Sequence, residues 1–114
     1  MKRPVKPKII CLCGSSRFVA DMAVLGWILE KEGNIVLGLH LLPANYPNGA
    51  PDHLAEHEGV EERMDELHLR KIDLADSVWI YNKDGYIGNS TRREIAYARE
   101  QGKTLHFIEP EIPS

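Results

Sequence analysis

Four short apolar runs, separated by segments with helical patterning, constrain the fold of this chain more than any other feature. The runs cover residues 8–13, 35–39, 77–81 and 104–108. A continuous apolar run that ends at turn residues is typical of a strand buried on both faces, as in a parallel sheet. The pattern predicts an α/β domain with a four- or five-stranded, mainly parallel sheet flanked by helices.

Three segments between these runs predict helices. The first is the clearest, because its apolar positions repeat at the spacing of one helical face; they are Phe18, Met22, Leu25 and Leu29. Trp27, on the same predicted helix, is also expected in the core. The other two helices are expected from about residue 60 to 75 and from about 91 to 101. Residues 40–58 are rich in proline, asparagine, glycine and histidine, and we expect them to form a long functional loop.

Size and charge limit the classes of function. The chain has 114 residues, so we expect one domain over residues 1–114 that gains stability as a homodimer or larger homo-oligomer. A net charge of -3 argues against nucleic acid as a partner. No apolar run approaches the length of a membrane span. The basic N-terminus, which two prolines interrupt, is not expected to be a targeting signal.

Both cysteines of the chain, Cys11 and Cys13, lie on the first predicted strand. We expect their side chains to point to opposite faces of the sheet and not to pair. This cysteine usage fits a reducing cytoplasm.

In parallel sheets of this kind, ligands bind beyond the carboxyl ends of the strands. The first segment there is Gly14-Ser15-Ser16-Arg17. Glycine permits a close approach, the serine hydroxyls and free amides bind oxygen atoms, and a guanidinium matches phosphate. The segment therefore predicts a phosphate site, although Ser15 or Ser16 could simply cap the following helix.

The second segment opens the third predicted helix with Asn89, Ser90 and Thr91, followed by Glu94. Two interpretations of Glu94 stay open. Thr91 and Glu94 have the spacing of a capping box, in which the glutamate only bonds back to the backbone. Alternatively, Glu94 is an ionised nucleophile beside the ligand, near the positive end of a helix.

His68 and Asp76 are further candidates for the site. His68 shares a helical stripe with apolar residues, so it faces either the core or the ligand crevice. Asp76 precedes the third strand and could merely bond to a turn. Histidines and glutamates between residues 40 and 58 could bind a metal, but a solvated loop is the simpler interpretation. We expect no metal and no cofactor.

These segments resemble a known family. The stretch ICLCGSSR (residues 10–17) resembles the opening of the 2'-deoxynucleoside 5'-phosphate N-hydrolases. The stretches LADSVWIYN (74–82) and NSTRREIAYAREQGK (89–103) resemble the wider nucleoside 2-deoxyribosyltransferase-like superfamily. The resemblance covers nearly the whole chain except residues 43–58 and the C-terminal tail.

The resemblance implies a flavodoxin-like (Rossmann-like) fold, a homodimer and a glycosidase. It implies that Glu94 attacks the anomeric carbon and that the loop from Gly14 to Arg17 holds the 5'-phosphate. Asn89, Ser90 and Thr91 correspond to residues that contact the phosphate or sugar. Asp76 matches the aspartate before a strand, and His68 stands where the family often has an aspartate that helps to protonate the leaving base.

We therefore expect hydrolysis, or transfer, at the N-glycosidic bond of a nucleoside 5'-monophosphate. The alternative is a nucleotide-binding sensor or regulatory module that uses the same crevice without catalysis. Either function requires a small-molecule nucleotide or nucleoside as ligand.

Overall fold

The computed structural model describes residues 6–39 and 54–110. They contain a four-stranded sheet of order β2-β1-β3-β4, in which each neighbouring pair is parallel. The strands are β1 (Ile9–Gly14), β2 (Ile35–Leu37), β3 (Ser77–Tyr81) and β4 (Thr104–Phe107). The expected α/β class is confirmed, and the architecture is compatible with a small flavodoxin-like domain.

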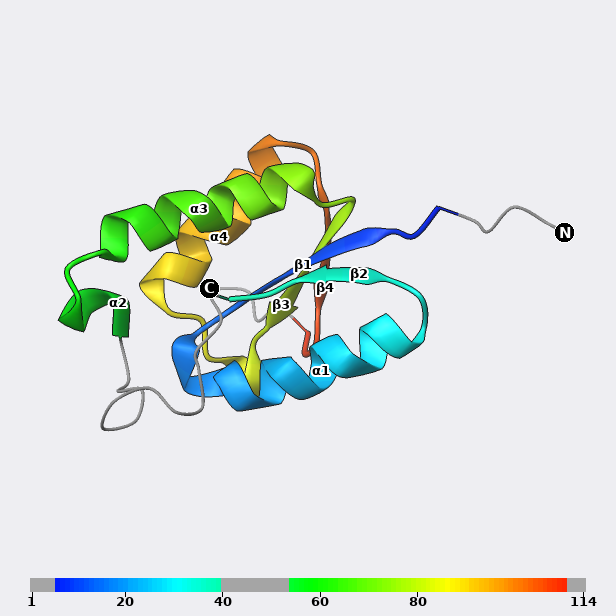
Figure 1. Ribbon diagram of the computed structural model, residues 1–114, viewed down its shortest axis with the longest axis horizontal. Coiled ribbons are helices and arrows are strands. Elements are labelled where there is room, and N and C mark those ends of the chain that lie inside the picture. The colour runs from blue at the N-terminus through cyan, green and yellow to red at the C-terminus, as the bar shows by residue number, and fades with distance from the viewer. Residues whose placement is uncertain (1–5, 40–53, 111–114) are drawn as a thin grey trace, which may run out of the picture.

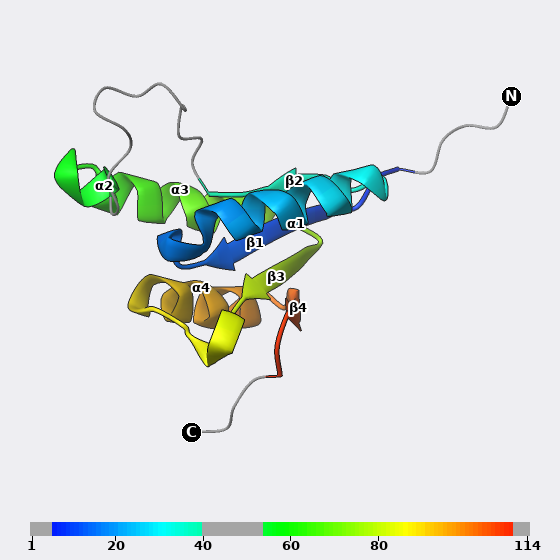
Figure 2. The same ribbon diagram turned by 90° about the horizontal axis from the view of Figure 1, so that it is seen from below.

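Four α-helices and two short 3₁₀ turns connect the strands. The helices are α1 (Val19–Lys31), α2 (Leu54–His57), α3 (Glu61–Leu74) and α4 (Asn89–Glu100). The turns are η1 (Ser16–Phe18), between β1 and α1, and η2 (Lys83–Gly85), after β3. In Figure 1, α1 covers one face of the sheet, whereas α3 and α4 cover the other. Figure 2 shows α1 lying along β1 and β2.

Two apolar clusters form the core, one on each face of β1. Ile10 and Leu12 pack with Met22 and Leu29 of α1. On the other face, the cysteines of β1 pack with Ile72 of α3 and with residues of β3 and α4. This burial on both faces explains why residues 9–13 form an uninterrupted apolar run.

Cys11 and Cys13 lie in the same cluster, on the face of the sheet that α3 and α4 cover. The expectation that they point to opposite faces is therefore wrong. Side chains alternate at every residue of a strand, so residues two apart share a face. The two thiols are free cysteines within the described residues.

Two other expectations need correction. Residues 54–57 of the predicted long loop form α2, while residues 40–53 of that loop lie outside the described residues. Trp27, expected in the core, is 63% exposed. It lies five residues after Met22 and so falls away from the buried stripe of α1.

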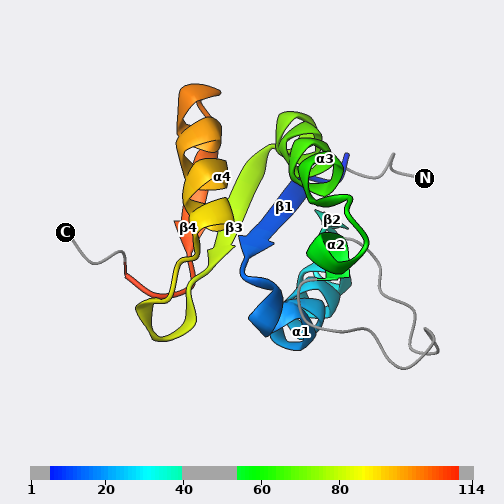
Figure 3. The ribbon, with the colours of Figure 1, turned by 90° about the vertical axis from the view of Figure 1, so that its left-hand side faces the viewer.

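The carboxyl ends of the strands meet at one edge of the sheet, which faces the viewer in Figure 3. The amino ends of α1 and α4 reach the same edge, as does α2. Among residues 6–39 and 54–110, no helix has both the length and the apolar character needed to cross a membrane.

Candidate functional site

A cavity of about 410 Å³ opens beyond the ends of β1 and β3. The strand order changes direction between these two strands, which is the usual place for a ligand in an open parallel sheet. The volume lies within the range of about 300–1,000 Å³ that is typical of small-molecule sites. The predicted site residues that line it are Gly14, Ser15, Ser16, His68, Asn89, Ser90, Thr91 and Glu94.

The loop after β1 forms one wall of the cavity. Ser15 accepts a hydrogen bond from the Arg17 amide, 3.3 Å from its Oγ, so it does cap the turn η1. Capping does not remove Ser15 from the site, because Ser15 and Ser16 both line the cavity. Gly14 is required for packing, since a Cβ there would lie 2.9 Å from Met22 Sδ and 3.1 Å from the Tyr81 carbonyl oxygen.

Arg17 is not among the residues that line the cavity. Its guanidinium carbon lies 3.8 Å from the centroid of the Tyr86 ring, and Tyr86 itself lines the cavity. The contact is a cation–π stack on an exposed side chain. It holds a positive charge close to the opening of the site.

The amino end of α4 forms the opposite wall. Gly88 is its N-cap, with extended backbone and no side-chain capping bond. The first helical hydrogen bond runs from the Arg92 amide to the Gly88 carbonyl, at 3.0 Å. The amides of Asn89, Ser90 and Thr91 therefore have no acceptor within the helix. This end of α4 presents free donors and a partial positive charge to the cavity.

The capping-box interpretation of Glu94 is wrong. It required Thr91 to cap the helix, but α4 begins two residues earlier and Thr91 is its third residue, 2% exposed. Glu94 thus lies in the second turn of α4, beyond the helix end whose free amides a capping box satisfies. The extended backbone at Gly88 ends the preceding loop and moves the helix start upstream.

Glu94 is 8% exposed and its carboxylate turns inward to the floor of the cavity. Its Oε1 has no hydrogen-bond partner among the described residues and lies 3.9 Å from Nε2 of His68. Burial raises the pKa of Glu94 to about 7, and the attraction of His68 offsets that rise only in part. The carboxyl group therefore changes charge near neutral pH.

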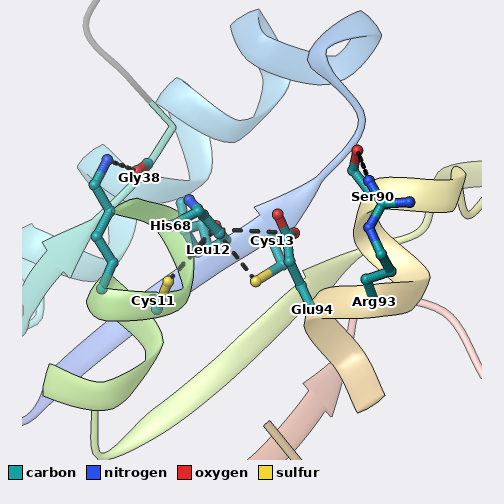
Figure 4. A network of polar contacts seen from close by, with 9 residues as sticks. Cys11, Leu12, Cys13, Gly38, His68, Ser90, Arg93 and Glu94 are labelled. Carbon is teal, nitrogen blue, oxygen red and sulfur yellow. Dashed lines mark hydrogen bonds and ion pairs between the residues drawn. The ribbon is translucent and has the colours of Figure 1, made fainter. Parts of the chain in front are cut away.

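His68, on α3, joins Glu94 to the two cysteines of β1 (Figure 4). Its Nε2 lies 3.4 Å from the Cys13 sulfur and 3.7 Å from the Cys11 sulfur. Burial alone would lower the pKa of His68, but the hydrogen bond to Cys11 and the negative charge of Glu94 raise it overall. The four side chains form one buried polar group beneath the cavity.

The two thiols have opposite tendencies within this group. A hydrogen bond from Cys13 is the main cause that lowers the pKa of Cys11 to about 5. The same bond, together with burial, raises the pKa of Cys13 well above its usual value. Cys11 therefore loses its proton more readily than Cys13.

The structure does not bring Asp76 to the site. Its Oδ2 accepts a hydrogen bond from the Ile9 amide at 2.8 Å, and its own amide donates to the Ile9 carbonyl at 2.7 Å. Both bonds join the starts of β1 and β3, whereas the cavity opens where these strands end. The position of Asp76 before a buried strand gives it a pairing role instead of a catalytic one.

Several residues of the site were not predicted from the sequence. Arg93 lines the cavity, where it donates to the Ser90 hydroxyl at 3.1 Å and forms an ion pair with Asp65 at 3.6 Å. Arg93 lies one turn after Ser90, so the helical spacing could have revealed it. Alternation along β1 places Cys11 and Cys13 on the same face of the sheet, the face that His68 contacts. The sequence analysis placed the two thiols on opposite faces and therefore did not predict that His68 contacts both.

No protein-family model matches the sequence, and no curated protein is significantly similar to it.

Proposed function

We propose that the protein cleaves the N-glycosidic bond of a nucleoside 5'-monophosphate, with water as the usual acceptor. The observation that supports this most directly is the Glu94 carboxylate. It is buried at the floor of a ligand-sized cavity, and one of its oxygens has no hydrogen-bond partner among the described residues. An unsatisfied buried oxygen destabilises a fold, and such groups are typical of functional sites.

A free carboxylate suits the chemistry of this bond. One oxygen of Glu94 attacks the anomeric carbon while the bond to the base nitrogen breaks and its electron pair leaves with the base. The base takes up a proton from solvent. Water then attacks the same carbon and loses one proton to solvent, which releases the sugar phosphate and restores the carboxylate. The transition states carry positive charge on the sugar, which a nearby anion stabilises.

The phosphate fits at the amino end of α4. Free amides at Asn89, Ser90 and Thr91, with the hydroxyls of Ser15 and Ser16 opposite, supply donors from two sides of the cavity. The Arg93 guanidinium lies beside Ser90 and adds a positive charge. A monophosphate bound here would hold its sugar near the second turn of α4, where Glu94 lies.

His68 is better suited to controlling Glu94 than to protonating the base. A glycosidase that forms a covalent intermediate usually keeps its acid and its nucleophile about 5–5.5 Å apart, across the bond that breaks. His68 Nε2 is only 3.9 Å from Glu94 Oε1 and is surrounded by thiols. We therefore assign His68 a positioning role.

Base release from a panel of nucleosides and their 5'-monophosphates tests the proposal, with free base separated by chromatography. We expect release from monophosphates and much less from nucleosides. Denaturing mass spectrometry of the quenched reaction should show the protein plus one sugar phosphate. The adduct should be absent in Glu94→Gln and present in Glu100→Gln, which alters an exposed glutamate of the same helix.

The same experiment separates catalysis from binding alone. Thermal stabilisation by nucleotides without base release would contradict the proposal and favour a sensor module. Neither stabilisation nor release would contradict both functions. Homodimer formation is a separate part of the proposal, and the size of the domain supports it.

A further inference from the structure

The floor of the cavity brings together three side chains that bind metals. Sulfur atoms of Cys11 and Cys13 and a ring nitrogen of His68 lie within 4.8 Å of one another, and all three residues are buried. In Figure 4, the imidazole lies between the two thiols. The glycosidase chemistry proposed above has no use for the cysteines.

The spacing of these atoms fits a tetrahedral site. Zinc binds sulfur at about 2.3 Å and imidazole nitrogen at about 2.0–2.1 Å, so neighbouring ligand atoms lie about 3.5–3.8 Å apart. The sulfur-to-nitrogen distances are 3.7 Å for Cys11 and 3.4 Å for Cys13. Because β1 and α3 pack together and already hold the three side chains near these distances, only small side-chain adjustments are needed for tetrahedral coordination.

A fourth ligand is already at hand. Glu94 Oε1 lies 3.9 Å from the same His68 nitrogen and has no hydrogen-bond partner among the described residues. Its side chain is only 10% exposed. A bound cation would satisfy this oxygen and would offset the repulsion between a carboxylate and thiolates in a site of low dielectric constant. His68 and Glu94 also line the cavity, which supplies a path from solvent.

We propose that Cys11, Cys13, His68 and Glu94 form a binding site for a divalent cation that prefers thiolate and imidazole ligands, with Zn²⁺ as the best fit. Two thiolates and one imidazole exclude Mg²⁺ and Ca²⁺, which prefer oxygen ligands. The site departs from the expectation that the chain binds no metal.

Metal binding would also switch off Glu94, because the ion takes the oxygen that attacks the sugar. This consequence rests on the proposed function, whereas binding of the ion does not. Binding and inhibition can therefore fail separately.

Cobalt(II) provides the test, since it enters zinc sites and gives an absorption band when thiolates bind it. Chelator-treated, reduced protein would be titrated with Co²⁺ alone. We expect about one ion per chain, with a thiolate-to-cobalt band that disappears when Zn²⁺ displaces the ion. The chain has only two cysteines, so this band can come from no residues other than Cys11 and Cys13. Absence of the band at stoichiometric Co²⁺ would overturn the proposal.

Variants locate the remaining ligands. Cys13→Ser and His68→Gln should weaken Co²⁺ binding strongly. Glu94→Gln should weaken it by about tenfold or more, because loss of a direct ligand should cost at least as much affinity as loss of a residue that only hydrogen-bonds to a ligand. The matched control is His106→Gln, because His106 is exposed and stacks on Trp79 in another part of the sheet. Equal weakening in the control, or unchanged binding in His68→Gln, would refute the site.

If a cysteine variant fails to fold, the wild-type protein still decides the question. Bound Zn²⁺ should protect both thiols from alkylation in mild denaturant, as measured by mass spectrometry. Equal alkylation with and without Zn²⁺ would count against the site. Zinc binding without loss of base release would leave the metal site standing and would refute only the inhibition.

Discussion

Glu94→Gln should stabilise the metal-free protein at alkaline pH. The folded protein holds the pKa of Glu94 at about 7, compared with an ordinary value of 4.5, because burial disfavours the charged carboxylate. At 1.36 kcal/mol per pKa unit, this rise corresponds to a penalty of about 3 kcal/mol for the ionised form. Glutamine has nearly the same shape and no charge, so it removes the penalty.

The sign of this stability difference and its pH range follow from the linkage between folding and proton binding. A raised pKa in the folded state means that the unfolded chain releases its proton first as the pH increases. Below pH 4.5 Glu94 is neutral in both states, so variant and parent should be equally stable. The advantage of the variant should grow between pH 4.5 and 7 and stay constant above pH 7, at about 3 kcal/mol.

Urea unfolding at several pH values, with a chelator present, measures this difference. Glu100→Gln is the control, and its effect should be small at every pH because Glu100 is exposed. Base release by Glu94→Gln should meanwhile fall by roughly a thousandfold or more. A variant that is less stable than the parent at pH 8, or a difference that does not change with pH, would refute the burial argument.

Four further predictions test other parts of the site and of the fold. In metal-free protein, kcat/KM for base release should fall about tenfold per pH unit below pH 7, because only the ionised Glu94 attacks; a flat profile from pH 5 to 8 would contradict this. Arg17→Ala should weaken monophosphate binding by about 1 kcal/mol and leave nucleoside binding unchanged, since an exposed charge contributes little. An equal loss of affinity for both ligands, measured by calorimetry, would contradict this prediction. Gly14→Ala should destabilise the fold by about 1–3 kcal/mol, because its Cβ would press on Met22 and on the backbone of Tyr81. An unchanged midpoint of urea unfolding would contradict this prediction. Light scattering should show a homodimer, and a monomer mass at working concentration would rule it out.

Much of the fold could be predicted because it depends on local patterns. The apolar runs placed four strands, and the buried positions of α1 include Met22 and Leu29 of the predicted stripe. Helix ends were less accurate, since α4 begins at Asn89 and not at Thr91. Its start depends on the backbone of the preceding loop, which the apolar spacing does not describe.

The candidate site divides in the same way. Sequence order was enough to place Gly14 to Ser16 and Asn89 to Glu94 beyond strand ends, because parallel strands end at one edge. Sequence order could not show that the Glu94 carboxylate lies buried at the cavity whereas the Asp76 carboxylate does not. Asp76 joins the starts of two strands, and only the pairing of β1 with β3 shows that it lies away from the cavity.

Periodicity along the chain is enough to predict a parallel α/β sheet and the two loops that follow β1 and β3. The residues beneath those loops depend on how the helices pack on the sheet. His68 contacts Cys11 and Cys13 across more than fifty residues of chain, and packing of α3 and α4 on β1 buries the Glu94 carboxylate beside them. The burial of Glu94, and therefore its charge near pH 7, depends on residues distant in the sequence, which local patterns do not reveal.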